Sequence, residues 1–509
     1  MRTRRALVLV LALCVPAVAV AAAPTVAVAA PALHPRPAAA GIAPSTLTWR
    51  PCAQPGGPAG QECAELPVPL DYRSPDGPRL TLAVSRLRGE RPPARRGTLI
   101  VIPGGPGSSG VQRLAQKGDA MREALGGAYD IVSLDPRGVG ASTTARCGLD
   151  EDDRHLVTLR SWPGPDGDIT ENLAGSRRIA AACARNGGAV LRSFTTANQV
   201  RDIDLFRRAL GERRLSAWGI SYGTYVAAVY AQKYPQHTDR WVLDSSNDPA
   251  PERVGRGWLA NWAQGADDRF PDFAAWAAGP ARDSEGLRLA ERAEDVRPLF
   301  LDLAAQLDRA PKRTTTAGVP LTGNRLRQAM QNALYSDASF PSLARLVKQA
   351  QNPDATPVLT PDVAGPLPDE DAAVALAVIC NDVRWPAKPV SAYQRAVAAD
   401  RARHPLTAGM PVSINPCSFW KHAPADKPTR ITGKGPSNIL MIQNRRDPAT
   451  PHFAGLKMRR ALGDRARLVT VEHGGHGAYL SNGNRCGDHS VSRFLTTGHR
   501  PQHDTRCTG

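Results

Sequence analysis

The chain has 509 residues, of which 42% are hydrophobic, and its 64 basic and 47 acidic side chains give a formal net charge of +17. This length is enough for one large domain with an insertion or for two domains. Basic and acidic residues are interspersed without a basic stripe or an aromatic nucleic-acid motif, so we expect no nucleic-acid partner. The charge instead indicates a solvated surface that favours loose association with an anionic cell wall.

Residues 1–30 are typical of a secretory signal peptide. A cationic start, "MRTRR", precedes the apolar run "ALVLVLALCVPAVAVAAA", and small residues lead up to Ala30. The pair Arg4 and Arg5 leaves the twin-arginine route open beside the general secretory (Sec) route. Residues 31–44 are rich in proline and alanine and indicate a flexible leader or pro-segment. No later apolar run has the length of a membrane span, so we expect a secreted, extracellular protein.

Eight cysteines remain after Cys14, which lies inside the predicted signal peptide. An even number of cysteines in a secreted chain predicts disulfides, and the sequence alone leaves their pairing open. A metal site is not expected, because no C-x-x-C pair exists and the ligand-like gap between Cys486 and His489 lacks a second such pair. We expect neighbours in the sequence to pair, which gives Cys52–Cys63, Cys147–Cys183, Cys380–Cys417 and Cys486–Cys507.

Residues 45–248 alternate short β-type runs with helical runs. The hydrophobic period predicts helices at 199–211 and 225–234, and strands at 80–88, 98–105, 129–138, 215–221 and 240–246. Strand character returns in residues 431–509, at 437–447 and 466–476. This alternation predicts an α/β domain with a mostly parallel central sheet and helices on both faces.

Residues 249–430 interrupt this pattern. Helical windows follow one another there without convincing strands, at 257–264, 299–307, 326–335 and 371–382. The economical interpretation is a helical insertion within one α/β domain. Aromatic residues gather near its start, and we expect them to pack its core rather than to contact a substrate; they are Trp258, Trp262, Phe270, Phe273 and Trp276.

The stretch "GISYGTY", from Gly219 to Tyr225, joins a predicted strand to a predicted helix. Its G-x-S-x-G spacing is typical of a sharp turn that holds a serine nucleophile, here Ser221, clear of the surface. The alternative is a glycine-rich turn that contains a serine by coincidence, which 45 glycines permit. A serine nucleophile needs a general base that a third group orients, so the interpretation depends on an acid and a histidine at later strand ends.

Both groups are present, in the chain order Ser, Asp, His. Asp447 follows the predicted strand "NILMIQNRR", and His476 follows the next strand inside the glycine-rich "GGHG". Asp244, at the end of "RWVLD", is the alternative acid, and His473 is the alternative base. An Asp-Pro turn and a surface histidine are the structural alternatives. Thr450, three residues after Asp447, is close enough to orient its carboxylate.

The run "VIPGGPGSSG" also follows a predicted strand, and its glycines can present backbone N–H groups to an oxyanion. We expect one donor from Gly105, with Gly104 as the alternative, and the other from Tyr222, the residue after the nucleophile. A phosphate nest is the other interpretation, but no G-K-[ST] follows. Four elements in the expected order predict a catalytic serine.

Six motifs resemble those of the secreted tripeptidyl aminopeptidases of the α/β-hydrolase superfamily, relatives of the prolyl aminopeptidases: "PGGPGSSG", "LDPRGVGAS", "WGISYGTYVAAVYAQKYP", "LDSSNDP", "DPATP" and "HGGHG". The resemblance runs from about Leu47 to the C-terminus and is thin in the insertion. It implies an α/β-hydrolase fold with a large helical lid, and Ser221, Asp447 and His476 as nucleophile, acid and base. It also implies that no metal or cofactor is used and that short peptides are cleaved from a free N-terminus. Prolyl aminopeptidases carry a histidine where this chain has Pro103, which favours the tripeptidyl branch.

Two other functions stay open. A secreted carboxylester hydrolase would use the same triad, whereas a non-catalytic binding protein on this fold usually lacks one of its three members. A peptidase of this kind also needs a negative partner for the ammonium group of its substrate. We expect Asp382 in that role, because it follows an apolar helix that Cys380 pins; the alternative is an ordinary helix-end aspartate. The same stretch offers three further acids, Asp369, Glu370 and Asp371.

Overall fold

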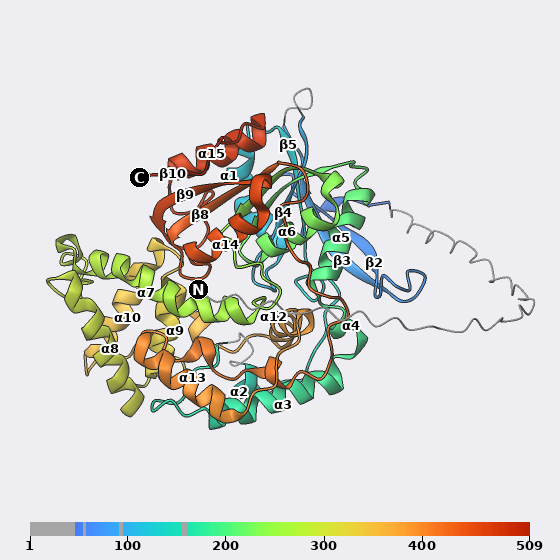
Figure 1. Cartoon of the computed structure of the whole chain (residues 1–509). Coiled ribbons are helices and arrows are strands. Elements are labelled where there is room, and N and C mark those ends of the chain that lie inside the picture. The colour runs from blue at the N-terminus through green and yellow to red at the C-terminus, as the bar shows by residue number, and fades with distance from the viewer. Residues whose placement is uncertain (1–45, 54–56, 91–94, 155–159, 509) are drawn as a thin grey trace, which may run out of the picture. The chain divides into compact units, whose positions relative to one another are not determined.

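The computed structural model describes residues 46–53, 57–90, 95–154 and 160–508, which belong to one compact unit (Figure 1). The predicted signal peptide, residues 1–30, and the predicted leader, residues 31–44, lie outside the described residues and stay predictions. Among the residues described, no helix combines the length and the apolar character needed to cross a bilayer.

A ten-stranded sheet forms the centre of the described chain, in the order β1-β2-β3-β5-β4-β6-β7-β8-β9-β10. The strands from β4 to β10 are parallel, and β1, β2 and β3 are antiparallel at one edge. The strands are β1 (Arg50–Pro51), β2 (Glu62–Pro69), β3 (Arg79–Leu87), β4 (Gly97–Ile102), β5 (Tyr129–Leu134), β6 (Leu215–Ile220), β7 (Thr238–Asp244), β8 (Ile439–Arg446), β9 (Ala466–Gly474) and β10 (Thr505–Cys507). The loops after the parallel strands therefore meet at one edge of the sheet.

Helices cover both faces of this sheet, as the alternating pattern predicts (Figure 1). One face carries α1 (Gly110–Ala124) and α15 (Arg485–Thr497), whose apolar residues share a core with the central strands. The other face carries α5 (Thr196–Ala209), α6 (Tyr222–Lys233) and α14 (His452–Leu462). Strand β6 is buried along its whole length, which explains its continuous apolar run.

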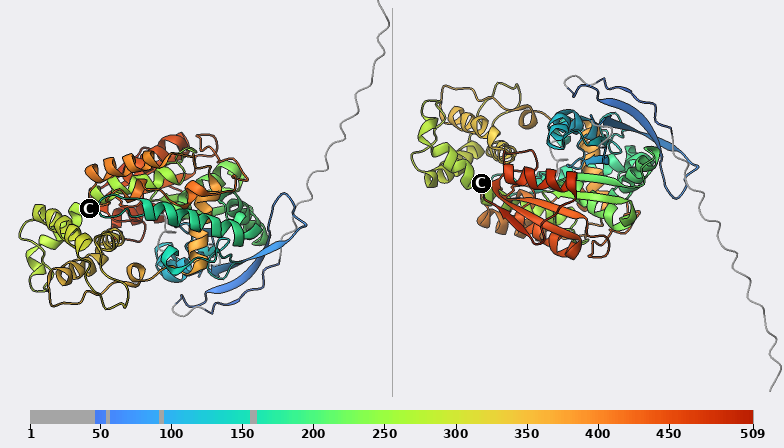
Figure 2. Two further views of the ribbon diagram at one scale, coloured as in Figure 1. Left: turned by 90° about the horizontal axis from the view of Figure 1, so that it is seen from below. Right: turned by 90° about the horizontal axis from the view of Figure 1, so that it is seen from above.

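Between β7 and β8 the chain forms a helical segment, and Figure 2 shows its first helices as a group beside the sheet. This segment has a hydrophobic core of its own, in which Phe270 contacts Phe273 and Phe300 edge to face. Its helices are α7 (Arg256–Ala278), α8 (Ala293–Arg309), α9 (Gly323–Ala333), α10 (Phe340–Gln351), α11 (Pro361–Ala364), α12 (Asp369–Asp382) and α13 (Val390–Arg403).

The aromatic residues at the start of the segment divide between two environments. Phe270 and Phe273 lie in the segment's core, and Trp276 packs against it. Trp258 instead contacts the rings of two α6 residues, Tyr222 and Tyr225. The helical segment is therefore packed against the helix that follows β6.

A second stretch of chain joins these helices. α2 (Glu151–Arg154), α3 (Thr170–Asn186) and α4 (Gly188–Arg192) lie between β5 and β6, within the residues that the sequence pattern groups with the sheet. α3 packs on η7 (Pro416–Phe419), and α4 packs on α12. The helical layer thus combines two segments that are far apart in the sequence.

The structure contains the four disulfides expected between sequence neighbours: Cys52–Cys63, Cys147–Cys183, Cys380–Cys417 and Cys486–Cys507. The second joins the chain after β5 to α3, and the third joins α12 to η7. These two bonds fix both chain segments of the helical layer. The fourth ties β10 to α15.

A buried ion pair joins the loop after β5 to α5 and is hydrogen-bonded to the end of β2. The Arg137 guanidinium donates to both carboxylate oxygens of Asp202 at 2.8 and 2.9 Å, and neither side chain is more than 2% exposed. Arg137 also donates to the carbonyl oxygens of Pro69 and Leu70, and the Tyr72 hydroxyl donates to Asp202. The arginine of "LDPRGVGAS" therefore has a structural role in holding the sheet to α5.

Replacing Asp202 by alanine should lower the free energy of unfolding by about 3–5 kcal/mol, because it leaves the Arg137 charge buried without a partner. Chemical denaturation followed by circular dichroism measures this change. Glu65→Ala is the control, since it breaks the exposed pair with Arg50 and should leave stability nearly unchanged. An Asp202→Ala variant as stable as the control would contradict the prediction.

Candidate active site

Ser221 lies at the turn between β6 and α6 with backbone angles of φ 58° and ψ −127°. A positive φ is costly for a residue other than glycine, so the surrounding structure must hold this conformation. The Ser221 amide donates to the Asp244 carbonyl oxygen at 3.0 Å, and the Thr224 amide donates to the Ser221 carbonyl oxygen at 2.9 Å. These bonds fix the serine at the edge where the loops of the parallel strands meet.

The two glycines of G-x-S-x-G are required by close packing. A Cβ atom at Gly219 would lie 2.7 Å from the Gly223 carbonyl oxygen, and one at Gly223 would lie 2.3 Å from the Ile102 carbonyl oxygen. Only hydrogen fits at either position, because real Cβ atoms do not approach oxygen so closely. The motif therefore reflects the packing of β6, α6 and β4 around Ser221, and the coincidental turn does not explain it.

Asp447 follows β8 directly, and its side chain is completely buried. One carboxylate oxygen accepts from the amides of Ala449 and Thr450 at 2.9 and 2.8 Å, and the other accepts from the Thr450 hydroxyl at 2.8 Å. The structure thus places Thr450 on the Asp447 carboxylate, where the sequence spacing predicts it.

His476 lies on the loop after β9, and its Nδ1 is 3.0 Å from each oxygen of Asp447. Asn444, at the end of β8, donates from its side-chain amide to the carbonyl oxygens of Gly475 and Gly477. The His476 amide donates to the Tyr335 carbonyl oxygen at 2.8 Å. Hydrogen bonds on both sides of His476 therefore hold its loop in place.

The titration of His476 depends on Asp447. Burial alone would lower the pKa of the imidazole, but the charge of Asp447 and its hydrogen bond to Nδ1 raise the pKa above the ordinary value of 6.5. The neutral imidazole with a proton on Nδ1 leaves Nε2 as the basic atom. Such a pair can accept a proton from a hydroxyl and stabilise the imidazolium that results.

The alternative acid and base have other partners. Asp244 is buried at the end of β7, and its carboxylate accepts from the amides of Ala478 and Tyr479 at 2.9 Å. It therefore supports the backbone just after His476. His473 lies with Nδ1 2.7 Å from the Gly474 carbonyl oxygen and points to Asp337, 3.9 Å from its Nε2. The structure brings Asp447 and His476 together and separates His473 from that pair.

The glycine-rich loop after β4 lies directly beside Ser221. A Cβ atom at Gly104 would be 2.9 Å from the Ser221 Cβ atom. The amide of Gly105, the next residue, and the amide of Tyr222 have no hydrogen-bond partner within the described residues. The Tyr222 amide is at the N-terminus of α6, where the helix leaves N–H groups free for an anion.

The three acids at the start of α12 differ in their hydrogen-bond and ion-pair partners. Asp369 accepts from the amides of Gly148 and Leu149, and Glu370 pairs with Arg146. Asp371 is exposed and has no partner among the described residues; partial burial and Glu370 raise its pKa.

Asp382, at the other end of α12, accepts from the Thr196 amide at 2.8 Å and from the Thr196 hydroxyl. Burial raises the pKa of Asp382 to about 7. The structure thus places this carboxylate on the first residue of α5, as an ordinary helix-end aspartate would be.

Residues that the sequence analysis did not select complete the site. Tyr335, between α9 and α10, packs edge to face on the His476 ring with 4.9 Å between ring centroids. Asn444 brackets the His476 loop, as described above. In the sequence, Asn444 stands out as a polar residue at the end of the apolar run "ILMIQN". Tyr335 carries no comparable signal, because its contact depends on the fold of the helical segment.

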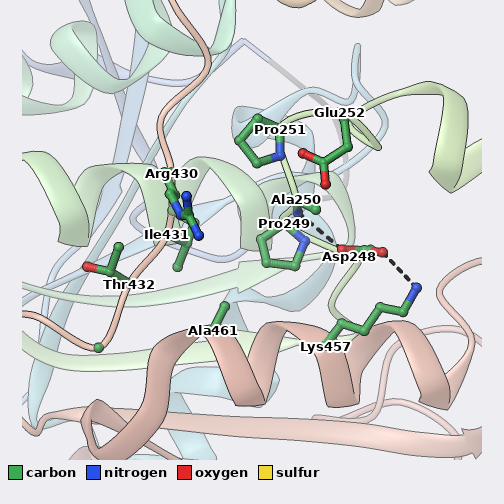
Figure 3. Close-up of a pocket in the computed structure, with 11 residues that line it drawn as sticks. Asp248, Pro249, Ala250, Pro251, Glu252, Arg430, Ile431, Thr432, Lys457 and Ala461 are labelled. Atoms are coloured by element: carbon green, nitrogen blue, oxygen red, sulfur yellow. Dashed lines mark hydrogen bonds and ion pairs between the residues drawn. The ribbon is translucent and has the colours of Figure 1, made fainter. Parts of the chain in front are cut away.

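A hollow of about 510 Å³ lies where the chain enters and leaves the helical segment (Figure 3). It is bounded by residues 248–252 on entry, by residues 430–433 on return, and by α14. The buried Asp248 pairs there with Lys457 at 2.9 Å. Ser221, Asp447 and His476 do not line this hollow, so it is separate from the site described above.

Within the described part of the chain, no group of three or more His, Cys, Asp or Glu side chains could hold a metal ion. The chemistry that the site can perform is attack by a serine hydroxyl, with proton transfer to an imidazole and two free amides beside the reacting centre.

Comparison with known proteins gives one matching family model and three similar proteins. Residues 404–507 match the family model described as TAP-like protein. The tripeptidyl aminopeptidase of Streptomyces lividans is 32% identical over 490 residues, which cover 92% of this chain and 88% of that protein. The serine protease Hip1 of Mycobacterium tuberculosis is 27% identical over 490 residues, covering 91% of each. Carboxylesterase B of Mycobacterium tuberculosis is 29% identical over 461 residues, covering 87% and 86%.

The Asp447→Asn variant should have a lower pKa at His476 than the wild-type protein, because burial then acts without the opposing carboxylate charge. The midpoint of the wild-type imidazole should lie above 6.5, and that of the variant below it. NMR titration of histidine-labelled protein measures both values, and a His476→Gln sample assigns the signal. Equal midpoints in the two proteins would show that Asp447 does not control the imidazole.

Proposed function

The chain belongs to the tripeptidyl aminopeptidase-like family of α/β-hydrolases, which makes it a serine hydrolase, and on this premise we propose that it releases short peptides, tripeptides above all, from free N-termini. The observation that carries the proposal is the Asp447–His476 pair at the same sheet edge as the Ser221 turn. Peptides with a free N-terminus are the proposed substrates.

In the proposed reaction, Ser221 Oγ attacks the scissile carbonyl carbon while His476 Nε2 takes the hydroxyl proton. Asp447 holds the imidazole through Nδ1 and stabilises its positive charge. The amides of Gly105 and Tyr222 donate to the oxyanion of the tetrahedral intermediate. The imidazolium then gives its proton to the leaving amine, which leaves an acyl-enzyme, and water repeats the sequence to release the peptide.

We also propose that residues 249–430 act as a lid that selects substrates. α12 reaches the oxyanion loop, since a Cβ atom at Gly107 would lie 3.2 Å from Val374. Asp371 lies one helical turn before Val374 and Ala375 on the same side of α12, and it has no partner within the described part of the chain. Asp382 is a weaker candidate for the substrate ammonium, because Thr196 occupies its carboxylate and burial favours its neutral form. Asp371 is therefore our preferred amine anchor.

A carboxylester hydrolase is the second candidate function, and the similarity to carboxylesterase B favours it. The same serine, acid and base would serve, because ester and amide hydrolysis share the acyl-enzyme. Rapid turnover of short esters without cleavage of any free-amine peptide would decide for this alternative.

The four disulfides support the proposal that the protein is secreted, since such bonds persist in oxidising compartments. The choice between the Sec and twin-arginine routes and the loose association with the cell wall stay predictions from the sequence.

Replacing Ser221 by alanine should abolish cleavage of tripeptidyl p-nitroanilides while leaving the fold intact, because the turn rests on backbone contacts and glycines. Losses in the Ser221→Ala, His476→Ala and double variants should be strongly non-additive, since the residues act as a unit. Steady-state kinetics and circular dichroism check the two expectations. Activity of the folded Ser221→Ala variant close to that of the wild type would refute the assignment.

The amine anchor is tested with Asp371→Asn and Asp382→Asn as a matched pair. Asp371→Asn should lower kcat/KM for free-amine tripeptidyl substrates by roughly 30-fold or more, because the substrate ammonium loses its partner. Hydrolysis of small esters without an amine should stay nearly the same. Asp382→Asn should affect both substrate types equally, through the start of α5. The reverse result would return the role to Asp382.

A further inference from the structure

A second hollow, of about 640 Å³, lies within the helical layer. We call it the α9 hollow, because α9 forms one wall. The chain from Pro361 to Pro368 forms another wall, and Arg160 and Trp162 also line the hollow. Val363, Leu367 and the Trp162 ring give it apolar surface.

Two parts of the lining of the α9 hollow adjoin residues of the candidate active site. Arg160 also lines a small cavity together with Tyr335 and Pro448. Tyr335 packs on the His476 ring, and Pro448 directly follows Asp447. On the other wall, Pro368 immediately precedes α12, the helix that packs on the glycine-rich loop beside Ser221. The hollow therefore adjoins residues that pack against the candidate active site.

Two arginines in this hollow have no carboxylate partner among the residues that the structure describes. Arg160 donates to the Asn332 side chain at 3.1 Å and lies over the Trp262 ring, but its Nε is buried without a hydrogen-bond partner. Arg325 donates to the Pro320 carbonyl oxygen, and burial lowers its pKa with no acid to oppose the shift. Both arginines line the same hollow, and a guanidinium group without a carboxylate partner can bind an anion, so the pair indicates an anion site.

The acidic residue that lines the α9 hollow does not neutralise these charges directly. Asp362 accepts a hydrogen bond from the Asn332 side-chain amide, and the oxygen of that amide accepts from Arg160. Asn332 thus separates the carboxylate from the guanidinium. With two cations and one anion among its lining residues, the hollow has a net positive charge.

We propose that the α9 hollow is a substrate subsite that binds a carboxylate of the peptide, with Arg160 and Arg325 as its positive partners. This inference rests on the proposed function. The carboxylate has two sources in a peptide: a glutamate or aspartate side chain in the released tripeptide, or the C-terminal α-carboxylate of a short substrate. The apolar wall accepts the aliphatic part of either group.

Two sets of matched substrates distinguish these sources. The first replaces alanine by glutamate or by glutamine at each position of a tripeptidyl p-nitroanilide. The second compares hexa-alanine carrying a free C-terminal carboxylate with its C-terminal amide. At least one charged substrate should be preferred over its neutral counterpart by roughly ten-fold in kcat/KM. A glutamate preference identifies the side chain, and an acid-over-amide preference identifies the α-carboxylate.

Arg160→Gln and Arg325→Gln should each reduce that preference, and Arg325→Gln should leave kcat/KM for the neutral substrate within about two-fold of the wild type. Arg160→Lys should retain part of it. Arg345→Gln is the control, because it removes an exposed positive charge from α10 outside the hollow. The absence of any charge preference in the wild type, or an equal loss on neutral substrates, overturns the proposal.

Binding to the Ser221→Ala variant separates this result from a failure of the proposed function. Calorimetry with the acid and amide forms of hexa-alanine, and with tri-alanine amide containing glutamate or glutamine, needs no turnover. Tighter binding of a charged peptide that disappears with Arg160→Gln supports the subsite even if no free-amine peptide is cleaved. Equal binding of charged and neutral peptides overturns it, whatever the reaction proves to be.

Discussion

A charged carboxylate removed from water must be satisfied by donors, and this constraint shapes the centre of the molecule at Asp447. Two backbone amides, one hydroxyl and one imidazole meet its two oxygens. The amides come from the tight turn "DPATP" that follows β8, so this turn itself supplies hydrogen bonds to the carboxylate of its first residue, Asp447. The imidazole can complete the set only if the loop after β9 returns to the same edge. Asn444 and Asp244 hold that loop, and their burial follows from the same requirement.

The helical segment is part of this arrangement and does more than cover it. The Tyr335 ring packs on the His476 ring, and the Tyr335 carbonyl oxygen accepts a hydrogen bond from the His476 amide. A Cβ atom at Gly265 of α7 would lie 2.4 Å from the Pro448 carbonyl oxygen, so α7 packs tightly on the Asp447 turn. Arg446, at the end of β8, pairs with Asp272 of α7. The helical layer therefore contacts the loops that carry both the acid and the base.

The local signals of the sequence account for most of the fold and for the nucleophile region. The hydrophobic pattern predicts β3 to β9, whereas β2, with polar and apolar residues in alternation, and the short edge strands β1 and β10 are missed. G-x-S-x-G predicts the Ser221 turn because its glycines are required by close packing. The atoms they pack against lie only a few residues away or on the adjacent strand. Long-range contacts cannot be predicted from such local patterns. Tyr335 and Arg160 lie in different segments, and no local pattern shows that they meet beside His476.

The same limit applies to the proposed amine anchor. The sequence favours Asp382 over Asp371, because Asp382 follows an apolar helix that Cys380 pins. Their difference arises from Thr196, about 190 residues before Asp382, which occupies one of them. The boundary of the helical layer has the same origin, since α3 and α4 join it through contacts with η7 and α12. A pattern read along the chain assigns residues to elements, whereas partners between distant elements depend on the assembled fold.

The pairing of β10 with β9 has a consequence for how the protein is handled. An open edge strand offers unpaired backbone groups to other chains, and β9, which leads to His476, would be such an edge. Residues 505–507 cover it as a short parallel strand, and the Cys486–Cys507 bond prevents that strand from leaving. The chain thus caps its own sheet with its last residues. Removing them, or preparing the protein under reducing conditions, would uncover an adhesive β-edge directly beside the site and favour self-association.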